Sequence, residues 1–254
     1  MRLNDVLRAL PSPLREALLR RSLSIADEDS KFRAGQPTMW GSLRNLAEWF
    51  RPAGIIDVGA NVGAWATEAS QIFACPIHMI EAQPSLEPQL RATGFPYTIC
   101  LLGPESRAST GFYISGTGSS VMAEVTGFSE KQVSLPMRRL DDLELGLSAP
   151  LLLKLDVQGF ELQVLAGASE TLSKTEVVLS EVSLLEYNER QPLMAEMIAY
   201  MAERDFLPYD ICGGLRRWSD SALFQTDVIF VRRDSTLRHK RKFWRHDSIV
   251  EDNI

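Results

Sequence analysis

A glycine-bearing turn after residue 55 has the clearest chemical signature in the chain. The apolar, β-prone run Ile55–Ala60 leads into Gly-Ala-Asn-Val-Gly at positions 59–63. Such a turn between a strand and a helix lets a ligand approach backbone atoms that a Cβ would otherwise cover. Glu81 ends the next apolar run, 24 residues after Asp57, where a carboxylate can accept hydrogen bonds from a ribose diol. These residues predict a site for an adenosine-containing ligand.

The charge at this turn separates two kinds of adenosine ligand. A dinucleotide site uses Gly-x-Gly-x-x-Gly to bring a pyrophosphate to a helix N-terminus, whereas this chain has Gly-x-Asn-x-Gly with Asp57 two residues before Gly59. A carboxylate there repels a pyrophosphate and favours a cationic amino group. S-adenosylmethionine carries an ammonium, a sulfonium and a ribose but no phosphate, so it is the predicted cofactor. The alternative is a purely structural turn with a buried Asp57.

A second polar cluster follows two later apolar runs. Lys154, Asp156 and Gln158 lie at the end of Leu151–Val157, and Glu181 lies within or just after Val177–Ser183. Parallel sheets bind ligands at the carboxyl ends of their strands, so these four residues are the predicted catalytic set. In one hypothesis Asp156 accepts the proton of an acceptor hydroxyl; in another, Asp156 and Glu181 hold a divalent cation such as Mg²⁺.

A structural interpretation of this cluster stays open. It makes Lys154 and Asp156 an ion pair, with Gln158 and Gly159 capping the next helix. Further loop residues could contact either ligand: Ser119 and Ser120 in a Gly-Thr-Gly-Ser-Ser turn, Tyr187, Asn188 and Glu189 after the fifth strand, and Trp40, Trp218, Arg216 and Arg217.

The elements that must position these residues alternate along the chain. Apolar β-prone runs at 55–60, 77–82, 97–102, 151–157 and 177–183 are separated by helical stripes, including 65–73, 84–92, 160–172 and 194–201. This alternation predicts βαβ units and a mainly parallel sheet with helices on both faces. Runs 206–212 and 227–233 are joined by Gly-Gly and polar residues without a crossover helix, which predicts an antiparallel hairpin. Short β pieces are expected at 111–115, 119–123 and 133–138.

Several segments together closely resemble the FkbM family of methyltransferases. The resemblance covers about residues 40–233, and Lys154–Glu161 (Lys-x-Asp-Val-Gln-Gly-x-Glu) is its most specific element. The other matching segments are Asp57–Gly63, Leu140–Leu143, Leu165–Ala168 and Thr226–Val231. The resemblance implies a class I (Rossmann-like) methyltransferase fold with a seven-stranded sheet, and O-methylation of a sugar or a polyketide-type hydroxyl.

The resemblance also implies which residues surround the cofactor. Relatives often end the third strand with Ser-Asp or Gly-Asp, whereas this chain has Leu-Gly-Pro-Glu, so Glu105 is expected to stand in near the adenine. The predicted cofactor-binding residues are Asp57, Gly59, Ala60, Asn61, Gly63, Glu81, Ala82, Glu105, Ser119, Ser120 and Asp156.

Composition and charge limit the possible domain organisation and location of the protein. The chain has 254 residues and a net charge of -6, with basic ends (+3 over residues 1–24 and +6 over 232–246) and an acidic body of -12 over 25–231. We expect an N-terminal helical arm over 1–36, one catalytic domain over 37–233 and a basic tail over 234–254. Three separated cysteines and the absence of a long apolar run favour a cytoplasmic protein. The basic ends could still contact an anionic membrane or a lipid-linked substrate.

Three other functions compete with a small-molecule or glycan methyltransferase. A nucleic-acid methyltransferase is disfavoured by the acidic body and by Asp156-Val157-Gln158-Gly159 where an Asn/Asp-Pro-Pro-aromatic loop would be expected. A non-catalytic module could bind an adenosine ligand or a membrane surface. A dehydrogenase is disfavoured by Asp57. The sequence leaves the acceptor and the oligomeric state open.

Overall fold

The computed structural model describes residues 37–114, 119–122 and 131–239. The chain divides into two units, residues 1–48 and 49–254, each described by itself. In the first unit, α3 (Met39–Ala47) begins after Thr38, whose hydroxyl accepts a hydrogen bond from the Gly41 N–H at 3.2 Å. The predicted arm over residues 1–36 and most of the basic tail lie outside the described residues.

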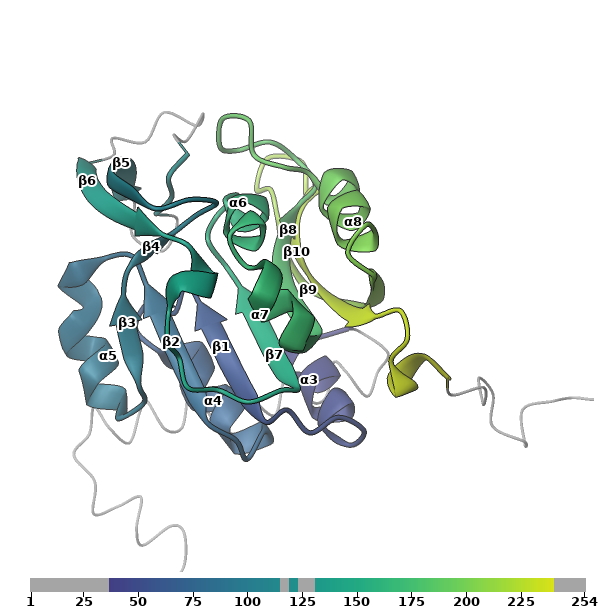
Figure 1. Ribbon diagram of the computed structural model, residues 1–254. Coiled ribbons are helices and arrows are strands. Elements are labelled where there is room, and N and C mark those ends of the chain that lie inside the picture. Colours follow the sequence, from purple (N-terminus) through teal and green to yellow (C-terminus); the bar gives the residue numbers. More distant parts are fainter. Residues whose placement is uncertain (1–36, 115–118, 123–130, 240–254) are drawn as a thin grey trace, which may run out of the picture. The chain divides into compact units, whose positions relative to one another are not determined.

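The second unit is built on a seven-stranded sheet (Figure 1). Its order is β3-β2-β1-β7-β8-β10-β9, and β10 runs antiparallel to both β8 and β9 while the other pairs are parallel. This confirms the predicted sheet and its antiparallel hairpin. The strands are β1 (Gly54–Val58), β2 (Ile77–Glu81), β3 (Tyr97–Ile99), β7 (Leu151–Leu155), β8 (Thr175–Ser183), β9 (Phe206–Arg216) and β10 (Leu223–Arg232).

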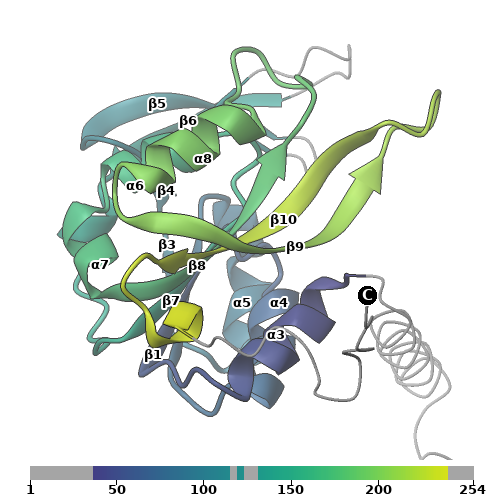
Figure 2. The ribbon, with the colours of Figure 1, turned by 90° about the vertical axis from the view of Figure 1, so that its right-hand side faces the viewer.

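Helices cover both faces of this sheet, as predicted (Figure 2). On one face lie α4 (Ala64–Ile72) and α5 (Glu87–Thr93), the latter preceded by a 3₁₀ turn at Pro84–Leu86; on the other lie α6 (Glu161–Ala166), α7 (Ser169–Lys174) and α8 (Met194–Ala202). Because both faces are covered, all five residues of β1 and all five of β7 are buried. None of the described helices is long and apolar enough to cross a membrane.

The single helix expected over 160–172 is two helices. The chain turns at Gly167, where a Cβ would lie 2.2 Å from the carbonyl oxygen of Gly103. The Gly167 carbonyl instead accepts a hydrogen bond from the Asp141 N–H at 3.1 Å. A close backbone approach from the preceding segment therefore separates α6 from α7, and the apolar periodicity does not reveal it.

The third predicted strand is also divided, because two sheets share it. Tyr97–Ile99 joins the main sheet as β3, whereas β4 (Leu101–Leu102) pairs with β6 (Lys131–Arg138), which pairs with β5 (Arg107–Ile114). This three-stranded sheet has its own apolar centre of Leu101, Phe112 and Met137. Two of the expected short β pieces are thus β5 and β6, and the third contributes an isolated bridge from Ser120 to Tyr113.

The chain remains packed beyond the domain boundary predicted at residue 233. A 3₁₀ turn at Thr236–His239 buries Leu237, and the Arg238 guanidinium donates to the carbonyl of Pro208 at 2.7 Å and to that of Leu207. Residues 234–239 therefore belong structurally with β9.

Candidate active site

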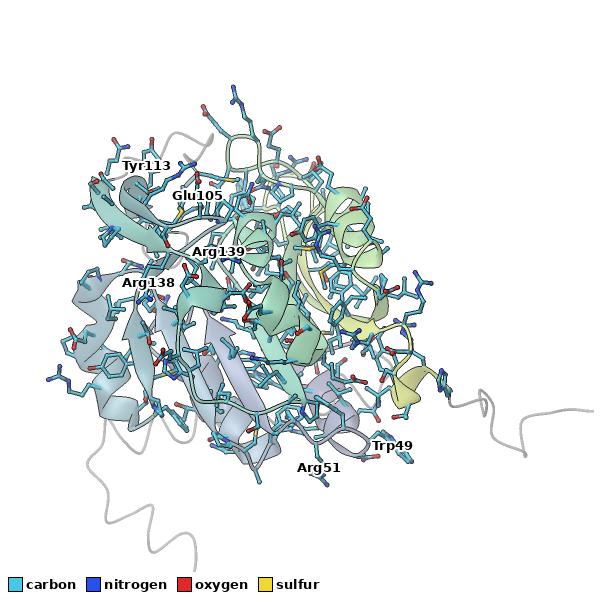
Figure 3. All side chains as sticks on the ribbon, in the orientation of Figure 1. Trp49, Arg51, Glu105, Tyr113, Arg138 and Arg139 are labelled. Carbon is cyan, nitrogen blue, oxygen red and sulfur yellow. The ribbon has the colours of Figure 1, made fainter. Side chains whose placement is uncertain are left out.

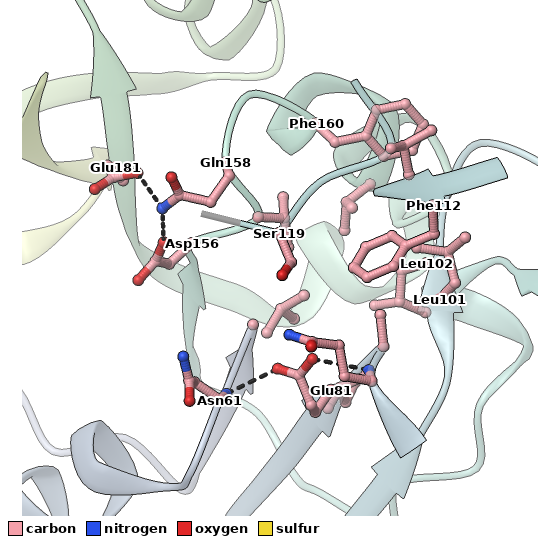
Figure 4. A pocket seen from close by; sticks show the side chains of 18 of the residues that line it. Asn61, Glu81, Leu101, Leu102, Phe112, Ser119, Asp156, Gln158, Phe160 and Glu181 are labelled. Atoms are coloured by element: carbon pink, nitrogen blue, oxygen red, sulfur yellow. Dashed lines mark hydrogen bonds between the residues drawn. The ribbon is translucent and has the colours of Figure 1, made fainter. Parts of the chain in front are cut away.

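One cavity of about 430 Å³ opens at the carboxyl ends of the parallel strands (Figure 4). This position is where parallel α/β sheets bind their ligands, and the volume lies within the usual range for small-molecule sites. Its apolar end is lined by Ala82, Leu101, Leu102, Phe112, Val121 and Phe160. Its polar side is lined by Asn61, Glu81, Asp156, Gln158, Glu181 and Gln225.

Gly59 lets two strand ends approach each other at the cavity wall. Its φ is +76°, and a Cβ there would lie 1.8 Å from the carbonyl oxygen of Asp156. The Asp156 N–H in turn donates to the Val58 carbonyl at 3.1 Å. A glycine is therefore required both for its conformation and for the space it leaves.

The other small residues of the turn have structural roles. Gly63, with a φ of +78°, precedes α4, and a Cβ there would lie 2.7 Å from Thr93 Cγ2. Ala60 is buried, and its N–H donates to the Ile80 carbonyl at 3.1 Å. Neither Ala60 nor Gly63 lines the cavity, so the structure does not support the expectation that these two residues contact the cofactor.

Glu81 and Asn61, two of the predicted cofactor-binding residues, meet at the end of β2. The Asn61 N–H donates to Glu81 Oε2 at 2.8 Å, and the Gln83 N–H donates to Oε1 at 2.9 Å (Figure 4). Burial raises the pKa of Glu81, while these two backbone N–H groups oppose the shift. Each carboxylate oxygen is thus held by one backbone group and keeps acceptor capacity toward the cavity.

Asp57 does not face the ligand cavity, which corrects the expectation that it meets a ligand ammonium. Its carboxylate is fully buried and lies 3.0 Å from Lys154 Nζ. The same ammonium donates to the Gly59 carbonyl at 3.0 Å and lies 3.5 Å from Asp156 Oδ2. Burial alone would lower the pKa of Lys154, but Asp57 and Asp156 outweigh it and raise the pKa. Lys154 therefore joins β1 to β7 beneath the cavity without lining it.

Gln158 bridges the two predicted catalytic carboxylates. Its Nε2 donates to Asp156 Oδ1 and to Glu181 Oε2, each at 2.8 Å (Figure 4). Gln158 adopts a φ of +55°, a conformation uncommon for a residue with a side chain. Its carbonyl accepts hydrogen bonds from Ser120 Oγ and Asn188 Nδ2, both at 2.8 Å, which stabilise that conformation.

Tyr187 and Gln225 complete the hydrogen-bond ring around Gln158. The Tyr187 hydroxyl donates to Gln158 Oε1 at 2.9 Å, and Gln225 Nε2 donates to Glu181 Oε2 and to the Tyr187 oxygen, both at 2.8 Å. The sequence indicated Tyr187 as a loop candidate but missed Gln225. The polar run Gln225-Thr226-Asp227 before the apolar end of the final strand is the signal that could have found it, and Gln225 is buried in the structure.

The carboxyl groups of this region have different environments. Burial, followed by the charges of Asp156, Glu161 and Asp227, raises the pKa of Glu181 to about 9. Burial and then Asp156 raise the pKa of Asp227 to about 7. The Asp156 side chain, by contrast, is 39% exposed. Glu181 is therefore predominantly protonated at neutral pH, next to the more open Asp156.

The predicted metal site has a hydrogen-bond donor at its centre. The Gln158 amide lies between Asp156 and Glu181, where a cation would have to displace it. Among the residues that the structure describes, no group of three or more His, Cys, Asp or Glu side chains is arranged to hold a metal ion. The position between Asp156 and Glu181 is thus occupied by the Gln158 amide, which hydrogen-bonds to both carboxyl groups.

Helix capping at this loop is also different from the structural interpretation of the sequence. Glu161 Oε1, not Gln158, accepts from the backbone N–H groups of Val157 and Gly159, at 3.1 and 3.2 Å. Burial raises the pKa of Glu161 to about 7. The Glu161 carboxylate, five residues after Asp156, thus holds the loop that carries Gln158. The Lys154–Asp156 ion pair of that interpretation is present.

Glu105 lies away from the cavity, which corrects its assignment near the adenine. Its side chain is 60% exposed at the surface and is paired with Arg107 (Figure 3). Of the two serines in the Gly-Thr-Gly-Ser-Ser turn, Ser119 lines the cavity and Ser120 is buried against the Gln158 backbone. The place expected for Glu105 is bordered by Cys100, Leu101 and Leu102.

Together the sheet order, the glycine turn and the cavity define a class I, S-adenosylmethionine-dependent methyltransferase. The model of the methyltransferase FkbM domain matches residues 57–208, more than half of the chain. The chain belongs to the FkbM methyltransferase family.

Known proteins show further similarity. The chain is 47% identical over 66 residues to the 2-O-methyltransferase NoeI of Sinorhizobium fredii, a match that spans 25% of this chain and 27% of that relative. Two solved structures are also similar. Precorrin-6y C5,15-methyltransferase from Geobacter metallireducens has a TM-score of 0.42 and 11% identity, covering 76% of this chain and 86% of that one. Magnesium protoporphyrin IX methyltransferase from Synechocystis has a TM-score of 0.41 and 14% identity, covering 81% and 83%. At these scores neither structure bears on the acceptor.

Proposed function

We propose that this protein is an O-methyltransferase that acts on a hydroxyl group of a sugar, glycan or polyketide-like small molecule, with Asp156 as the general base. The observation that carries the proposal is the environment of Asp156. Glu81, Asp156 and Glu181 line the cavity; the Asp156 side chain is 39% exposed, and Gln158 and Lys154 hold it from two sides. The similarity to a 2-O-methyltransferase over 66 residues supports oxygen as the methylated atom.

The residues around the cavity fit the cofactor. Glu81 offers carboxylate acceptors for a ribose diol beside Asn61, and the apolar end with Phe112 suits a purine ring. Glu81 and Asp156 suit a cationic ligand, the role first expected of Asp57. When bound, S-adenosylmethionine supplies a methyl group on a sulfonium, which is already activated toward displacement.

The protein's own residues then align the acceptor and accept its proton. As the acceptor oxygen attacks, Asp156 would accept the hydroxyl proton. The bound donor would supply the methyl group and would keep the electron pair of the broken C–S bond on its sulfur. Asp156 fits this role because Lys154 and the Gln158 amide orient it without covering it. General-base catalysis of this kind contributes about 10²–10⁴-fold, and alignment of the reactants contributes further.

The test is Asp156→Asn, assayed with labelled S-adenosylmethionine over a panel of sugars, glycans and hydroxylated natural products. We expect turnover to fall by about 10²–10⁴-fold, and the cofactor affinity measured by calorimetry to fall far less than turnover. Turnover like that of the wild type would eliminate Asp156 as the base. Activity that survives excess chelator would eliminate a divalent cation at Asp156 and Glu181.

A further inference from the structure

The cavity extends from the predicted cofactor end to the terminal hairpin. Along the sheet order, its lining passes from Glu81 on β2 through Asp156 after β7 and Glu181 on β8 to Gln225 on β10 and Leu215 on β9. Glu81 lies at the end with the ribose and adenine features, so Leu215 lies at the opposite end, beyond the proposed base. The hairpin therefore borders the space in which the acceptor must lie.

A bulge in the hairpin aims Leu215 into this space. Asp227 pairs with Cys212 and Gln225 pairs with Leu215, so two residues of β10 are opposed by three of β9. Paired residues lie on the same face of a sheet, so the extra residue places Leu215 on the face of Gln225, whose side chain reaches Glu181. Without the bulge, position 214 would oppose Gln225, and Leu215 would face the other side.

Two glycines allow the bulge. Gly213 has a φ of +69°, and a Cβ there would lie 2.7 Å from Asp227 Oδ2. Gly214 has a φ of +139°, and a Cβ there would lie 2.8 Å from Leu223 Cδ1. Residues with side chains rarely adopt either conformation. The Gly-Gly pair therefore allows a bulge, after which the side chains of β9 point to the opposite face of the sheet from the one that regular alternation would give.

Apolar surface continues outward from Leu215. Leu215 is 55% exposed although it lines the cavity, and Trp218, three residues further along the hairpin turn, is 98% exposed. Trp218 does not itself line the cavity, but it presents an exposed aromatic ring three residues from the cavity-lining Leu215, which a ligand that extends out of the cavity could cover. Figure 2 shows that the end of the β9–β10 hairpin projects beyond the sheet.

We propose that the acceptor is amphiphilic: its hydroxyl-bearing part enters the cavity, and an attached apolar part lies against Leu215 and Trp218 on the hairpin. This proposal rests on the proposed function, because it names the substrate class of the same site. Leu215 acts as a specificity-determining residue, since it contacts the acceptor's apolar part and not the reacting atoms.

The test compares methyl and octyl β-D-glucopyranoside as probes that share one head group. Each is titrated by calorimetry into the full-length protein saturated with S-adenosylhomocysteine, below the concentration at which the octyl compound forms micelles. We expect the wild type to bind the octyl glucoside at least about tenfold more tightly, because its chain removes apolar surface from water. Leu215→Ala and Trp218→Ala should each reduce that preference at least about threefold.

Tyr209→Ala is the matched control, because Tyr209 is also exposed on β9 but does not line the cavity. It should leave the preference unchanged, and none of the variants should alter the affinity for S-adenosylhomocysteine. The proposal is overturned by equal affinities in the wild type, by the absence of saturable octyl glucoside binding, or by a full preference in Leu215→Ala. If S-adenosylhomocysteine itself does not bind to the wild type, the proposed function fails first, and this inference fails with it.

Discussion

At the scale of single residues, Glu181 and Asp156 lie in different environments within the same cavity. Glu181 accepts hydrogen bonds from Gln158 and Gln225 on one oxygen, and burial raises its pKa to about 9. Asp156 is more exposed and lies 3.5 Å from the Lys154 ammonium. Environments that separate the protonation of neighbouring carboxyl groups let one serve as a base while the other stays neutral.

The raised pKa of Glu181 makes the stability of the folded protein depend on pH. The folded state keeps a proton on Glu181 up to about pH 9, whereas the unfolded chain loses it near its ordinary pKa of 4.5. Between these values the folded state binds more protons, so the free energy of unfolding falls as the pH rises, by at most about 1.4 kcal/mol per pH unit. Glu181→Gln removes this contribution, so its stability should fall less between pH 5 and pH 9.

Urea denaturation at several pH values measures this difference. Glu203→Gln is the control, because Glu203 is an exposed residue at the end of α8, and it should follow the wild type. Turnover of Glu181→Gln at pH 7 should stay within about threefold of wild type. The same pH dependence of stability in Glu181→Gln and in the wild type would contradict the assignment of a neutral carboxyl.

The sequence predicted most of the residues that lie near the site, but not the directions in which their side chains point. Asp57 was a clear candidate, yet β1 pairs with β7 so that Asp57 lies opposite Lys154. That register places the carboxylate beside a buried ammonium 97 positions along the chain and turns it away from the cavity. Gln225 was missed for a similar reason, because its role depends on the pairing of β10 with β8.

At the scale of elements, local patterns predicted the strands well and their interruptions poorly. The alternation of apolar runs with helical stripes predicted the parallel sheet, and the connection without a crossover helix predicted the hairpin. The expected Gly-Gly turn was wrong, because Gly213 and Gly214 form a bulge within β9 and the strand continues to Arg216. The break between α6 and α7 and the division of Tyr97–Leu102 depend on contacts with distant segments, namely Gly103 and β6. Periodicity within a window carries no information on such contacts.

A substitution at Gly59 tests whether the close approach of this turn to the Asp156 backbone requires a glycine. Gly59→Ala places a Cβ 1.8 Å from the Asp156 carbonyl oxygen, so we expect a loss of at least about 3 kcal/mol of stability and the loss of cofactor binding. Gly94→Ala is the control, because Gly94 has a similar φ of +79° but no atom within 4 Å of its added Cβ. It should lose only about 1–2 kcal/mol.

Thermal or urea denaturation compares the two variants, with calorimetry for binding. Similar losses in both would show that the left-handed conformation alone, and not the contact with β7, requires a glycine at Gly59.

At the scale of the whole molecule, charge is distributed unevenly around the cavity. Glu81 and Asp156 line it together with the protonated Glu181, whereas no lysine or arginine of the described residues does so. Lys154 lies beneath the wall, already engaged with Asp57 and Asp156. The site therefore suits a cationic ligand better than a phosphate-bearing one.

This charge distribution predicts which adenosine ligand stabilises the protein. S-adenosylmethionine at about 100 times its Kd should add about 2.7 kcal/mol of stability, which raises Tm by roughly 5–10 °C. NAD⁺ at the same concentration should leave Tm unchanged, because its pyrophosphate would face carboxylates without a compensating cation. Thermal denaturation with each ligand measures the difference, and an equal rise with NAD⁺ would refute the charge argument.

The order of the cavity lining along the chain has an evolutionary consequence. Apart from Asp156 and its loop, the cofactor end comes from the first half of the chain, up to Phe112 and Val121, whereas the hairpin end comes from Glu181, Leu215 and Gln225. With the acceptor in the position proposed above, mutations in the hairpin half would diversify what is methylated while the first half would keep the donor. A chimera that exchanges the hairpin between relatives would inherit its acceptor from one parent and its cofactor site from the other.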